Sequence, residues 1–157
     1  MSEHPLVSVT VCVRDGGHWV DDCLDSLLQQ THRPLEIIAV NDGSSDDTKS
    51  KLDAWHEKYA GGEVPIHIIH QDSLGLSAGR MAAVKQSIGT WIAITDIDVR
   101  PEPDWIEQML NACKPIEDET IAAVTGRTVF QAHDDVVSRF RALEIASKYR
   151  NRPRRTS

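Results

Sequence analysis

The sequence predicts an α/β fold with helices on both faces of a mainly parallel central sheet, a three-layer αβα arrangement. Short apolar segments rich in β-branched residues alternate along the chain with amphipathic segments, as in proteins built on parallel sheets. Dense polar clusters follow several apolar segments, where the strands of such a sheet would end. The length of 157 residues, with 40% apolar and 26% charged residues, suits one compact core.

The expected strands are five apolar segments of strand length: 6–13, 35–40, 64–70, 91–95 and 121–129. The first, LVSVTVCV, carries no charge and suits a strand that is buried on both faces. His67 and His70 alternate about the third segment, and we expect them to be surface residues rather than ligands.

The expected helices are five segments with apolar residues at helical spacing or with helix-end signals: 19–31, 46–59, 77–87, 104–113 and 136–148. Ser44 or Ser45 is expected to cap the second helix. Gly61-Gly62 ends that helix, and Gly89 marks the end of the third. Up to the fifth strand, the order of elements is then βαβαβαβαβ, and the helix expected at 136–148 follows it.

Charge is distributed unevenly over the chain, whose formal net charge is −7. From Arg139 to the end, seven basic residues face the single acid Glu144, so the rest of the chain is strongly acidic. An acidic body argues against nucleic acid as a partner, because phosphate binding needs a basic face. The basic tail could contact a membrane surface or an anionic ligand, but a solvated helix end or linker is favoured.

The cysteines and the N-terminus bear on the compartment. Cys12, Cys23 and Cys113 are widely spaced and form no CxxC pair, which argues against a disulfide scaffold and a zinc ribbon. No segment is long and apolar enough for a membrane helix, and no secretory signal is visible at the N-terminus. A cytoplasmic protein is therefore expected.

The strongest chemical signal is Asp96-Ile97-Asp98, which follows an apolar strand segment. Two carboxylates at this spacing can approach one hard divalent cation, Mg²⁺ or Mn²⁺, which takes further oxygen ligands from phosphates. The segment NDGS at 41–44 also follows a strand, and its carboxylate could accept hydrogen bonds from a base or ribose. Asp15 and Asp72 occupy comparable positions after two other strands. Acids gathered at one sheet edge predict a cation site there.

Together these motifs resemble the family 2 glycosyltransferases, which have the GT-A nucleotide-sugar-binding fold, a Rossmann-like architecture. The similarity runs from Val7 to Gly126 in the family's order and spacing. It is carried by VSVTVCVRDG, CLDSLLQQTHRPLEIIAVNDGSSDDT, GLSAGRMAAVKQSIGTWIAITDID and PEPDWIEQML. The resemblance implies metal-dependent binding of a nucleotide diphosphate sugar, with a UDP-sugar favoured, for inverting transfer to an acceptor hydroxyl.

The resemblance also implies roles for individual residues. Asp42 matches the acid that recognises the base, usually uracil, and Asp15 falls where the family often has an acid or amide near the nucleotide. Arg80 matches an arginine that faces the nucleotide sugar. Asp96 matches the acid near ribose and sugar, and Asp98 matches the metal ligand.

Four positions depart from the family's usual residues, which leaves the donor open: Cys12, Asn41, Met81 and Val99. Cys12 replaces a Pro or Thr at the end of the first strand and is assigned to the nucleotide-sugar site. The family's catalytic base and acceptor-binding residues lie in a second half, which we expect beyond Ser157. Residues 1–135 are accordingly interpreted as the nucleotide-sugar-binding part and 136–157 as a basic helical tail.

Three other classes of protein share part of this pattern. A dinucleotide-binding oxidoreductase domain would need GxGxxG after the first strand, where this chain has RDGGHW. A receiver-like domain would also gather acids at a strand edge, but it gives no reason for the motifs between Asp42 and Asp98. A non-catalytic nucleotide-sugar-binding module or sensor stays open as the alternative, because no catalytic base is identified.

Overall fold

The computed structural model describes residues 4–113 and 123–126. These residues contain the strands β1 (Val7–Val13), β2 (Leu35–Asp42), β3 (Ile66–Gln71) and β4 (Trp91–Asp96). They also contain the helices α1 (Gly17–Leu28), α2 (Thr48–Lys58), α3 (Leu76–Gln86) and α4 (Trp105–Cys113). The chain divides into two compact units, Met1–Glu107 and Gln108–Ser157, and the whole sheet belongs to the first.

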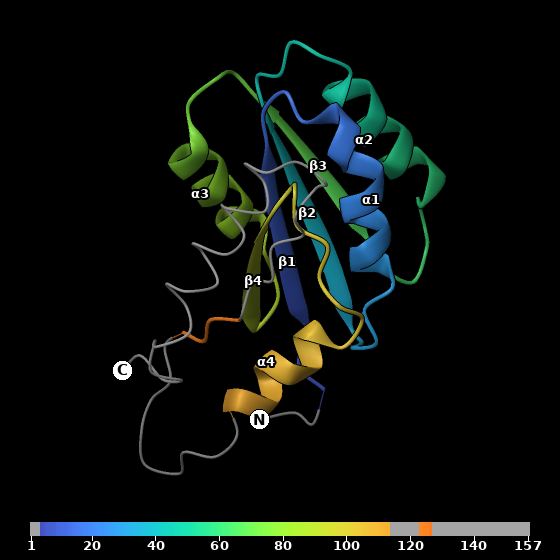
Figure 1. Cartoon of the computed structure of the whole chain (residues 1–157), viewed down its shortest axis with the longest axis vertical. Helices are drawn as coiled ribbons and strands as arrows, with labels where there is room; N and C mark the ends of the chain where they lie inside the picture. The colour runs from blue at the N-terminus through green and yellow to red at the C-terminus, as the bar shows by residue number, and fades with distance from the viewer. Residues whose placement is uncertain (1–3, 114–122, 127–157) are drawn as a thin grey trace, which may run out of the picture. The chain divides into compact units, whose positions relative to one another are not determined.

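The four strands form one parallel sheet in the order β3-β2-β1-β4 (Figure 1). From β1 the chain adds β2 and then β3 on one side, and it afterwards crosses back to place β4 on the other side of β1. The strand order therefore reverses between β1 and β4. In open sheets of this kind, ligands bind beyond the carboxyl ends of the strands at such a reversal.

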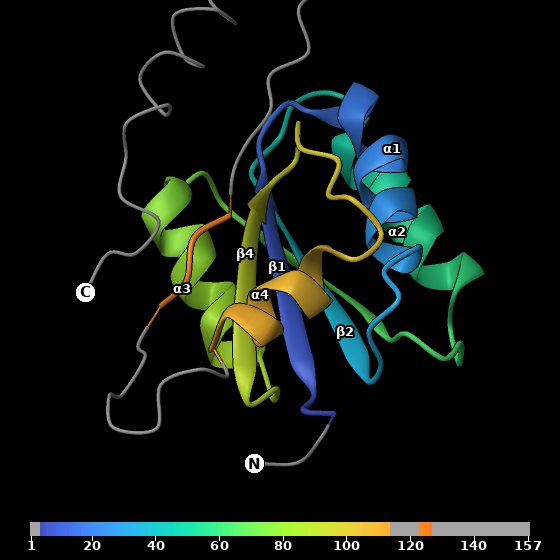
Figure 2. The same cartoon turned by 60° about the horizontal axis from the view of Figure 1, so that its bottom comes forward.

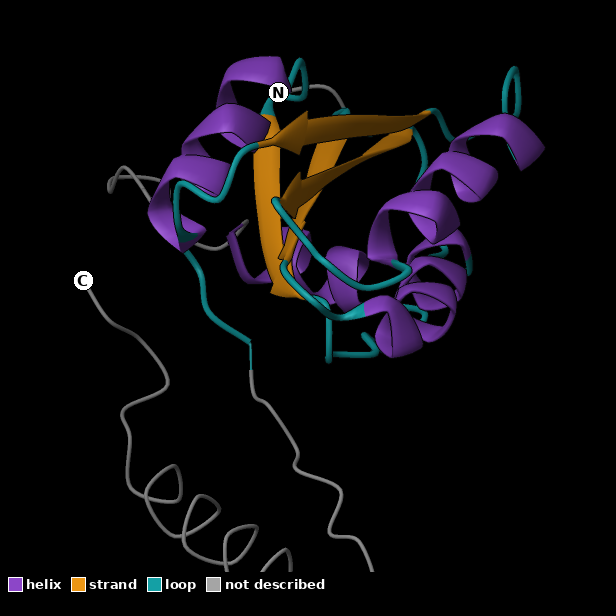
Figure 3. Cartoon of the chain, turned by 90° about the horizontal axis from the view of Figure 1, so that it is seen from above, coloured by secondary structure: helices purple, strands orange, loops and turns teal. Residues whose placement is uncertain are grey.

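Helices lie on both faces of the sheet, which confirms the predicted three-layer α/β class. Figures 2 and 3 show α1 and α2 together on one face and α3 on the other. On the α3 face, Ala83 packs with Ile38 and Val40 of β2. None of the described helices has the length and apolarity needed to cross a membrane.

Burial differs between the central and outer strands, and the sequence predicted only the burial of β1. All residues of β1 except the half-buried Cys12 are buried, as is every residue of β2, because helices cover both faces of these strands. Along β4, by contrast, Ile92 and Ile94 are exposed. The core of the first unit therefore lies over β1 and β2.

The predicted elements within 4–113 are confirmed, with shifts of a few residues at their ends. The largest gain is in β2, which continues to Asp42 because Asn41 and Asp42 pair with His70 and Gln71 of β3. Helix α1 ends at Leu28 instead of residue 31, where the Arg33 guanidinium donates a hydrogen bond to the Leu28 carbonyl (3.0 Å).

The structure describes only part of the C-terminal region for which predictions were made. Of the strand expected at 121–129, residues 123–126 are described, and they are neither helix nor strand. The helix expected at 136–148 and the domain boundary expected at 135 lie outside the described residues. Both stay predictions.

Candidate functional site

Four of the residues predicted for the site converge at the carboxyl edge of the sheet, on the face that α3 covers. Cys12 of β1 is in register with Asp96 of β4, and Asp42 of β2 lies on the same face as Cys12. From α3, Arg80 places Nη2 2.9 Å from Oδ1 of Asp96. This group lies beside the reversal of strand order, where a ligand is expected.

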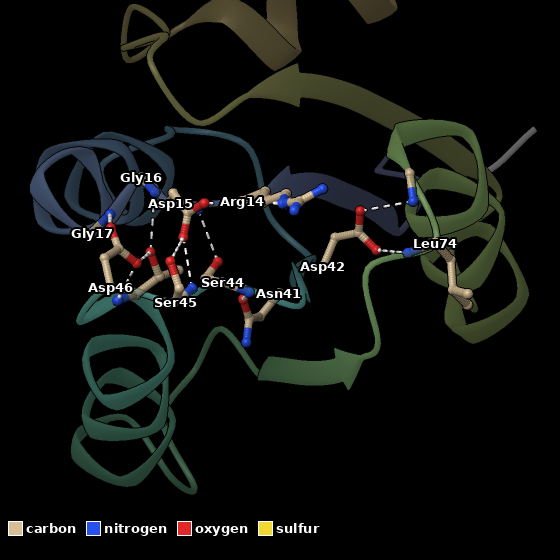
Figure 4. Close-up of polar contacts among 12 residues, drawn as sticks. Arg14, Asp15, Gly16, Gly17, Asn41, Asp42, Ser44, Ser45, Asp46 and Leu74 are labelled. Atoms are coloured by element: carbon tan, nitrogen blue, oxygen red, sulfur yellow. Dashed lines mark hydrogen bonds and ion pairs between the residues drawn. The ribbon is translucent and has the colours of Figure 1, made fainter.

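Asp42 is the most strongly bonded of these residues. Its Oδ1 accepts hydrogen bonds from Gln71 Nε2 (2.6 Å) and from the Leu74 amide (2.8 Å), and its Oδ2 accepts one from the Gly75 amide (2.9 Å). These bonds favour the charged form and lower the pKa of Asp42. The carboxylate therefore connects the end of β2 to the loop before α3, as its orientation toward Leu74 in Figure 4 shows.

Cys12 lies between the charged residues of this group, under the first turns of α3. A Cβ atom added at Gly79 would lie 3.3 Å from Cys12 Sγ, so glycine is what lets α3 approach β1 this closely. Burial raises the pKa of Cys12, and the negative charges of Asp42 and Asp96 raise it further against the opposing effect of Arg80. A neutral thiol therefore forms the floor of the site.

Asp15 contacts a different loop, the one that follows β2. Its backbone has a φ of 51°, and its Oδ1 accepts hydrogen bonds from the amide (2.6 Å) and the hydroxyl (3.0 Å) of Ser45. Its own amide donates to Ser44 Oγ (3.0 Å), and the bonds to Ser45 lower the pKa of Asp15 (Figure 4). Asp15 thus joins the β1–α1 loop to the β2–α2 loop.

The prediction that Ser44 or Ser45 caps α2 is wrong. The N-cap residue is Asp47, whose side chain makes no capping hydrogen bond, and the amide and hydroxyl of Thr48 both donate to Oδ1 of the preceding Asp46. Oδ2 of Asp46 also accepts a hydrogen bond from the Gly17 amide (3.0 Å), at the start of α1. These contacts lower the pKa of Asp46, and both serines are left to contact Asp15. Sequence alone did not distinguish four adjacent polar candidates.

Asp98, the predicted metal ligand, lies in the turn after β4 and is exposed. Within the described residues it takes part in no hydrogen bond or ion pair, and no group of three metal-ligating side chains is present there. Two neighbouring carboxylates nevertheless fit Mg²⁺ or Mn²⁺, which proteins often hold through one or two carboxylates together with substrate phosphates. Burial raises the pKa of the nearby Cys23 thiol to about 12, so this thiol stays protonated at neutral pH.

Sequence reasoning missed several residues that shape the site. Gln71 bonds to Asp42, and the charge of Arg14 contributes to the lowered pKa of that carboxyl. Gln71 could have been found from the strand register, since it is directly opposite Asp42. The amides of Leu74 and Gly75 carry no signal in the sequence, because any residue would supply them.

These features define an α/β protein with a parallel sheet and a group of polar and charged side chains at its strand-order reversal. The sequence model of Glycosyl transferase family 2 matches residues 8–156. The chain therefore belongs to the family 2 glycosyltransferases, which confirms the resemblance seen in the motifs.

Curated relatives agree with this assignment. EpsH of Bacillus subtilis (strain 168), which carries the name of a glycosyltransferase, is 34% identical over 152 residues, covering 97% of this chain and 41% of that protein. The chondroitin synthase of Pasteurella multocida (strain Pm70) is 32% identical over 127 residues, covering 80% of this chain and 12% of that protein. The chain thus spans about two fifths or less of the length of these relatives.

Solved structures share the fold, which confirms the GT-A type. A mannosyltransferase from Pyrobaculum calidifontis, PcManGT, in complex with GDP-Man and Mn²⁺, has a TM-score of 0.66 at 22% identity, over 72% of this chain and 33% of that one. TarS residues 1–349 from S. aureus, in complex with UDP-GlcNAc, has a TM-score of 0.57 at 18% identity, over 80% of this chain and 38% of that one.

Proposed function

We propose that this chain binds a nucleotide diphosphate sugar and supplies the nucleotide side of an inverting glycosyl transfer. The observation that carries the proposal is the group formed by Cys12, Asp42, Arg80 and Asp96 at the reversal of strand order. Nucleotide sugars in two structural neighbours, GDP-Man in PcManGT and UDP-GlcNAc in TarS, support a ligand of this class.

The hydrogen bonds of Asp42 favour uracil as the base. A carboxylate offers about four acceptor positions, and the chain itself uses two on Oδ1 and one on Oδ2. One position on Oδ2 is left, which matches the single N3–H donor of uracil. The adjacent N1–H and N2–H donors of guanine would need an acceptor on each oxygen. We therefore infer a UDP-sugar in preference to a GDP-sugar.

The other site residues suit the rest of such a donor. Arg80 would face the diphosphate, and Asp96, held by Arg80, would accept from the ribose hydroxyls. Asp98 and Asp96 would hold Mg²⁺ or Mn²⁺, which neutralises charge on a diphosphate leaving group when bound. Asp15 would keep the β2–α2 loop in place near the nucleotide.

The transfer itself is a direct displacement. The acceptor oxygen forms a bond to the anomeric carbon as the bond from that carbon to the diphosphate breaks, and a carboxylate takes the acceptor proton. No residue assigned above has that role, and we place the base and the acceptor site in a second half of the protein. The free cysteines Cys12, Cys23 and Cys113 support a reducing, cytoplasmic location.

Calorimetry with UDP, GDP and NAD, each with and without Mn²⁺ or Mg²⁺, tests the ligand class. We expect UDP to bind in a metal-dependent way and GDP to bind about tenfold more weakly, the cost of one unpaired buried donor. Binding of NAD with none of UDP or GDP would contradict the proposal. Equal binding of UDP and GDP would contradict only the choice of base.

Release of UDP from UDP-sugars separates an enzyme from a binding module. We expect little turnover by the 157 residues alone, since a missing general base costs about 10²–10⁴-fold. A version extended past Ser157 should turn over with a suitable acceptor. UDP binding without turnover by any extended version would favour the non-catalytic module or sensor.

A further inference from the structure

Three polar side chains outside the proposed site are hydrogen-bonded in series on the face that α1 and α2 cover. Asn41 Nδ2 lies 3.2 Å from His70 Nδ1, and His70 Nε2 lies 2.8 Å from Asp53 Oδ1. Asn41 and His70 are opposite each other in the β2–β3 register, so their side chains share a face. Asn41 is only 4% exposed, which makes the partners of its amide group energetically important.

The chemistry of the groups fixes the direction of each hydrogen bond. The ionised Asp53 carboxylate can only accept, so Nε2 of His70 carries the proton that it donates. In the neutral ring Nδ1 is then an acceptor, and the Asn41 amide group must turn Nδ2 toward it. The other end of that amide group, Oδ1, accepts from the Ser44 backbone amide (3.1 Å). His70 and the Ser44 amide thus require the same orientation of the Asn41 amide group.

This orientation reaches the proposed nucleotide site through the β2–α2 loop. Ser44, held by Asn41, accepts from the amide of Asp15, and the next residue, Ser45, donates to the Asp15 carboxylate. Asn41 also directly precedes Asp42 in β2. Figure 4 shows Ser44 and Ser45 of this loop between Asn41, at the end of β2, and Asp15 of the β1–α1 loop.

We propose that His70 is a positioning residue, which together with Asp53 locks the Asn41 amide group and so holds the β2–α2 loop in its nucleotide-binding shape. The effect of His70 on the loop does not depend on the proposed function, whereas its effect on nucleotide affinity rests on that function. If the ring offered a donor at Nδ1, it would face the amide Nδ2. Asn41 would then have to flip, and the Ser44 amide would lose its acceptor.

Two substitutions at His70 and a matched control test this role. His70→Phe keeps a ring but removes both hydrogen bonds, whereas His70→Gln keeps one donor and one acceptor in a planar group. The control is His67→Phe, on the same strand but on the opposite face, where His67 Nε2 lies 3.6 Å from Glu36 Oε2. If His70 contributed only to the stability of the fold, His70→Phe and His67→Phe would have the same effect on the β2–α2 loop.

The first readout is hydrogen exchange of the Ser44 amide without nucleotide. His70→Phe should speed this exchange about tenfold, the equivalent of one lost hydrogen bond, and His70→Gln should restore it to within about twofold. His67→Phe should leave it unchanged, even where it lowers the melting temperature. Nitrogen-15 spectra of labelled histidine should place the His70 proton on Nε2.

The second readout is UDP affinity with Mn²⁺, which should fall about fivefold in His70→Phe and recover in His70→Gln. Unchanged Ser44 exchange in His70→Phe, failure of His70→Gln to restore it, or a proton on Nδ1 would overturn the proposal. If the unsubstituted chain does not bind UDP, the proposed function fails. Ser44 exchange and the nitrogen spectrum still decide the role of His70.

Discussion

The acids at the carboxyl edge of the sheet fall into two regions, which differ in how many hydrogen bonds their carboxylates accept from the chain. Near β1 and β2, Asp15, Asp42 and Asp46 accept hydrogen bonds from backbone amides of neighbouring loops. After β4, and within the described residues, the Asp96 carboxylate has the single partner Arg80 and the Asp98 carboxylate has none. The acids of the first region are therefore paired by the chain's own backbone, whereas those of the second region have little or no pairing in the described part of the chain.

Burial adds to this contrast only at Asp42, because Asp15 and Asp46 are exposed and are held by their hydrogen bonds rather than by burial. β2 is buried throughout, so an unpaired acid at its end would be costly and backbone amides satisfy it. The side chains of Asp96 and Arg80 are 59% and 40% exposed, so water can reach the Asp96 carboxylate and the end of the guanidinium, whereas Arg80 Nε is buried without a partner in the described part of the chain. Substitutions in the first region should therefore affect both fold and binding. Substitutions in the second region should affect binding alone.

The largest effect is expected for Asp98→Ala, in the second region. UDP affinity in Mn²⁺ should fall about 100-fold, to the value without metal, because cation neutralisation of a diphosphate supplies several kcal/mol. The melting temperature should stay unchanged, since this exposed side chain contributes no described contact to the core. Calorimetry measures the UDP affinity and thermal melts measure the stability, with Asp25→Ala on the exposed face of α1 as the control. Unfolding of Asp98→Ala would instead make Asp98 structural.

Asp42→Asn should give the next largest effect, and it should affect both properties. An amide group presents a donor where the carboxylate accepts from Gln71, Leu74 or Gly75, so one donor of the β3–α3 loop loses its partner. The melting temperature should fall, and UDP affinity should drop about tenfold. The comparison between regions fails if the fold of Asp42→Asn is as stable as that of Asp98→Ala.

Acid should weaken the first region. The pKa values of Asp15, Asp42 and Asp46 are lowered from 3.8 by the hydrogen bonds that they accept. The stability they contribute is therefore complete above about pH 4 and is lost as pH falls through their folded-state pKa values. Melting temperatures between pH 6 and pH 2.5 should show this loss.

Asp46→Asn should reduce the acid-dependent part of that profile, because this carboxylate joins the starts of α1 and α2. Asp98→Ala and Asp25→Asn should leave it unchanged, since neither carboxylate accepts a hydrogen bond in the described part of the chain. An equal change in the profile of Asp98→Ala would mean that the second region also contributes to acid stability.

The two regions also differ in how far the sequence could predict them. The apolar runs predicted β1 to β4, and the motifs placed Asp42, Arg80 and Asp96 at one edge, where the structure brings them together. The extension of β2 to Asp42 was not predicted, because it depends on pairing with β3 and not on local composition. The amide donors to Asp42 were missed because backbone groups leave no trace in residue identity.

The series through His70 was missed for a related reason. Asp53, His70 and Asn41 come from three separate elements, and only the register of β2 against β3 places two of them opposite each other. His70 was expected to be a surface residue, and it is exposed, but its two ring nitrogens are both hydrogen-bonded. Exposure and function in positioning are thus compatible, which a reading of the sequence alone does not reveal.

The smallest effect is expected for Arg80→Lys, and it tests the second region most directly. Both partners of the Arg80–Asp96 ion pair are substantially exposed, so the pair should contribute well under 1 kcal/mol to stability, and thermal melts should be unchanged. Lysine keeps the charge but loses the planar fork that bonds a phosphate oxygen and a carboxylate together.

UDP affinity of Arg80→Lys should therefore fall about fivefold, whereas affinity for uridine, which lacks the diphosphate, should not change. Titration of both ligands into both proteins measures the difference. If uridine binding weakens equally, Arg80 acts on the base side through Cys12 and Asp42, and the boundary between the two regions does not lie between β1 and β4. If only UDP binding weakens, the second region is specific for the diphosphate, while the base is read by the first region.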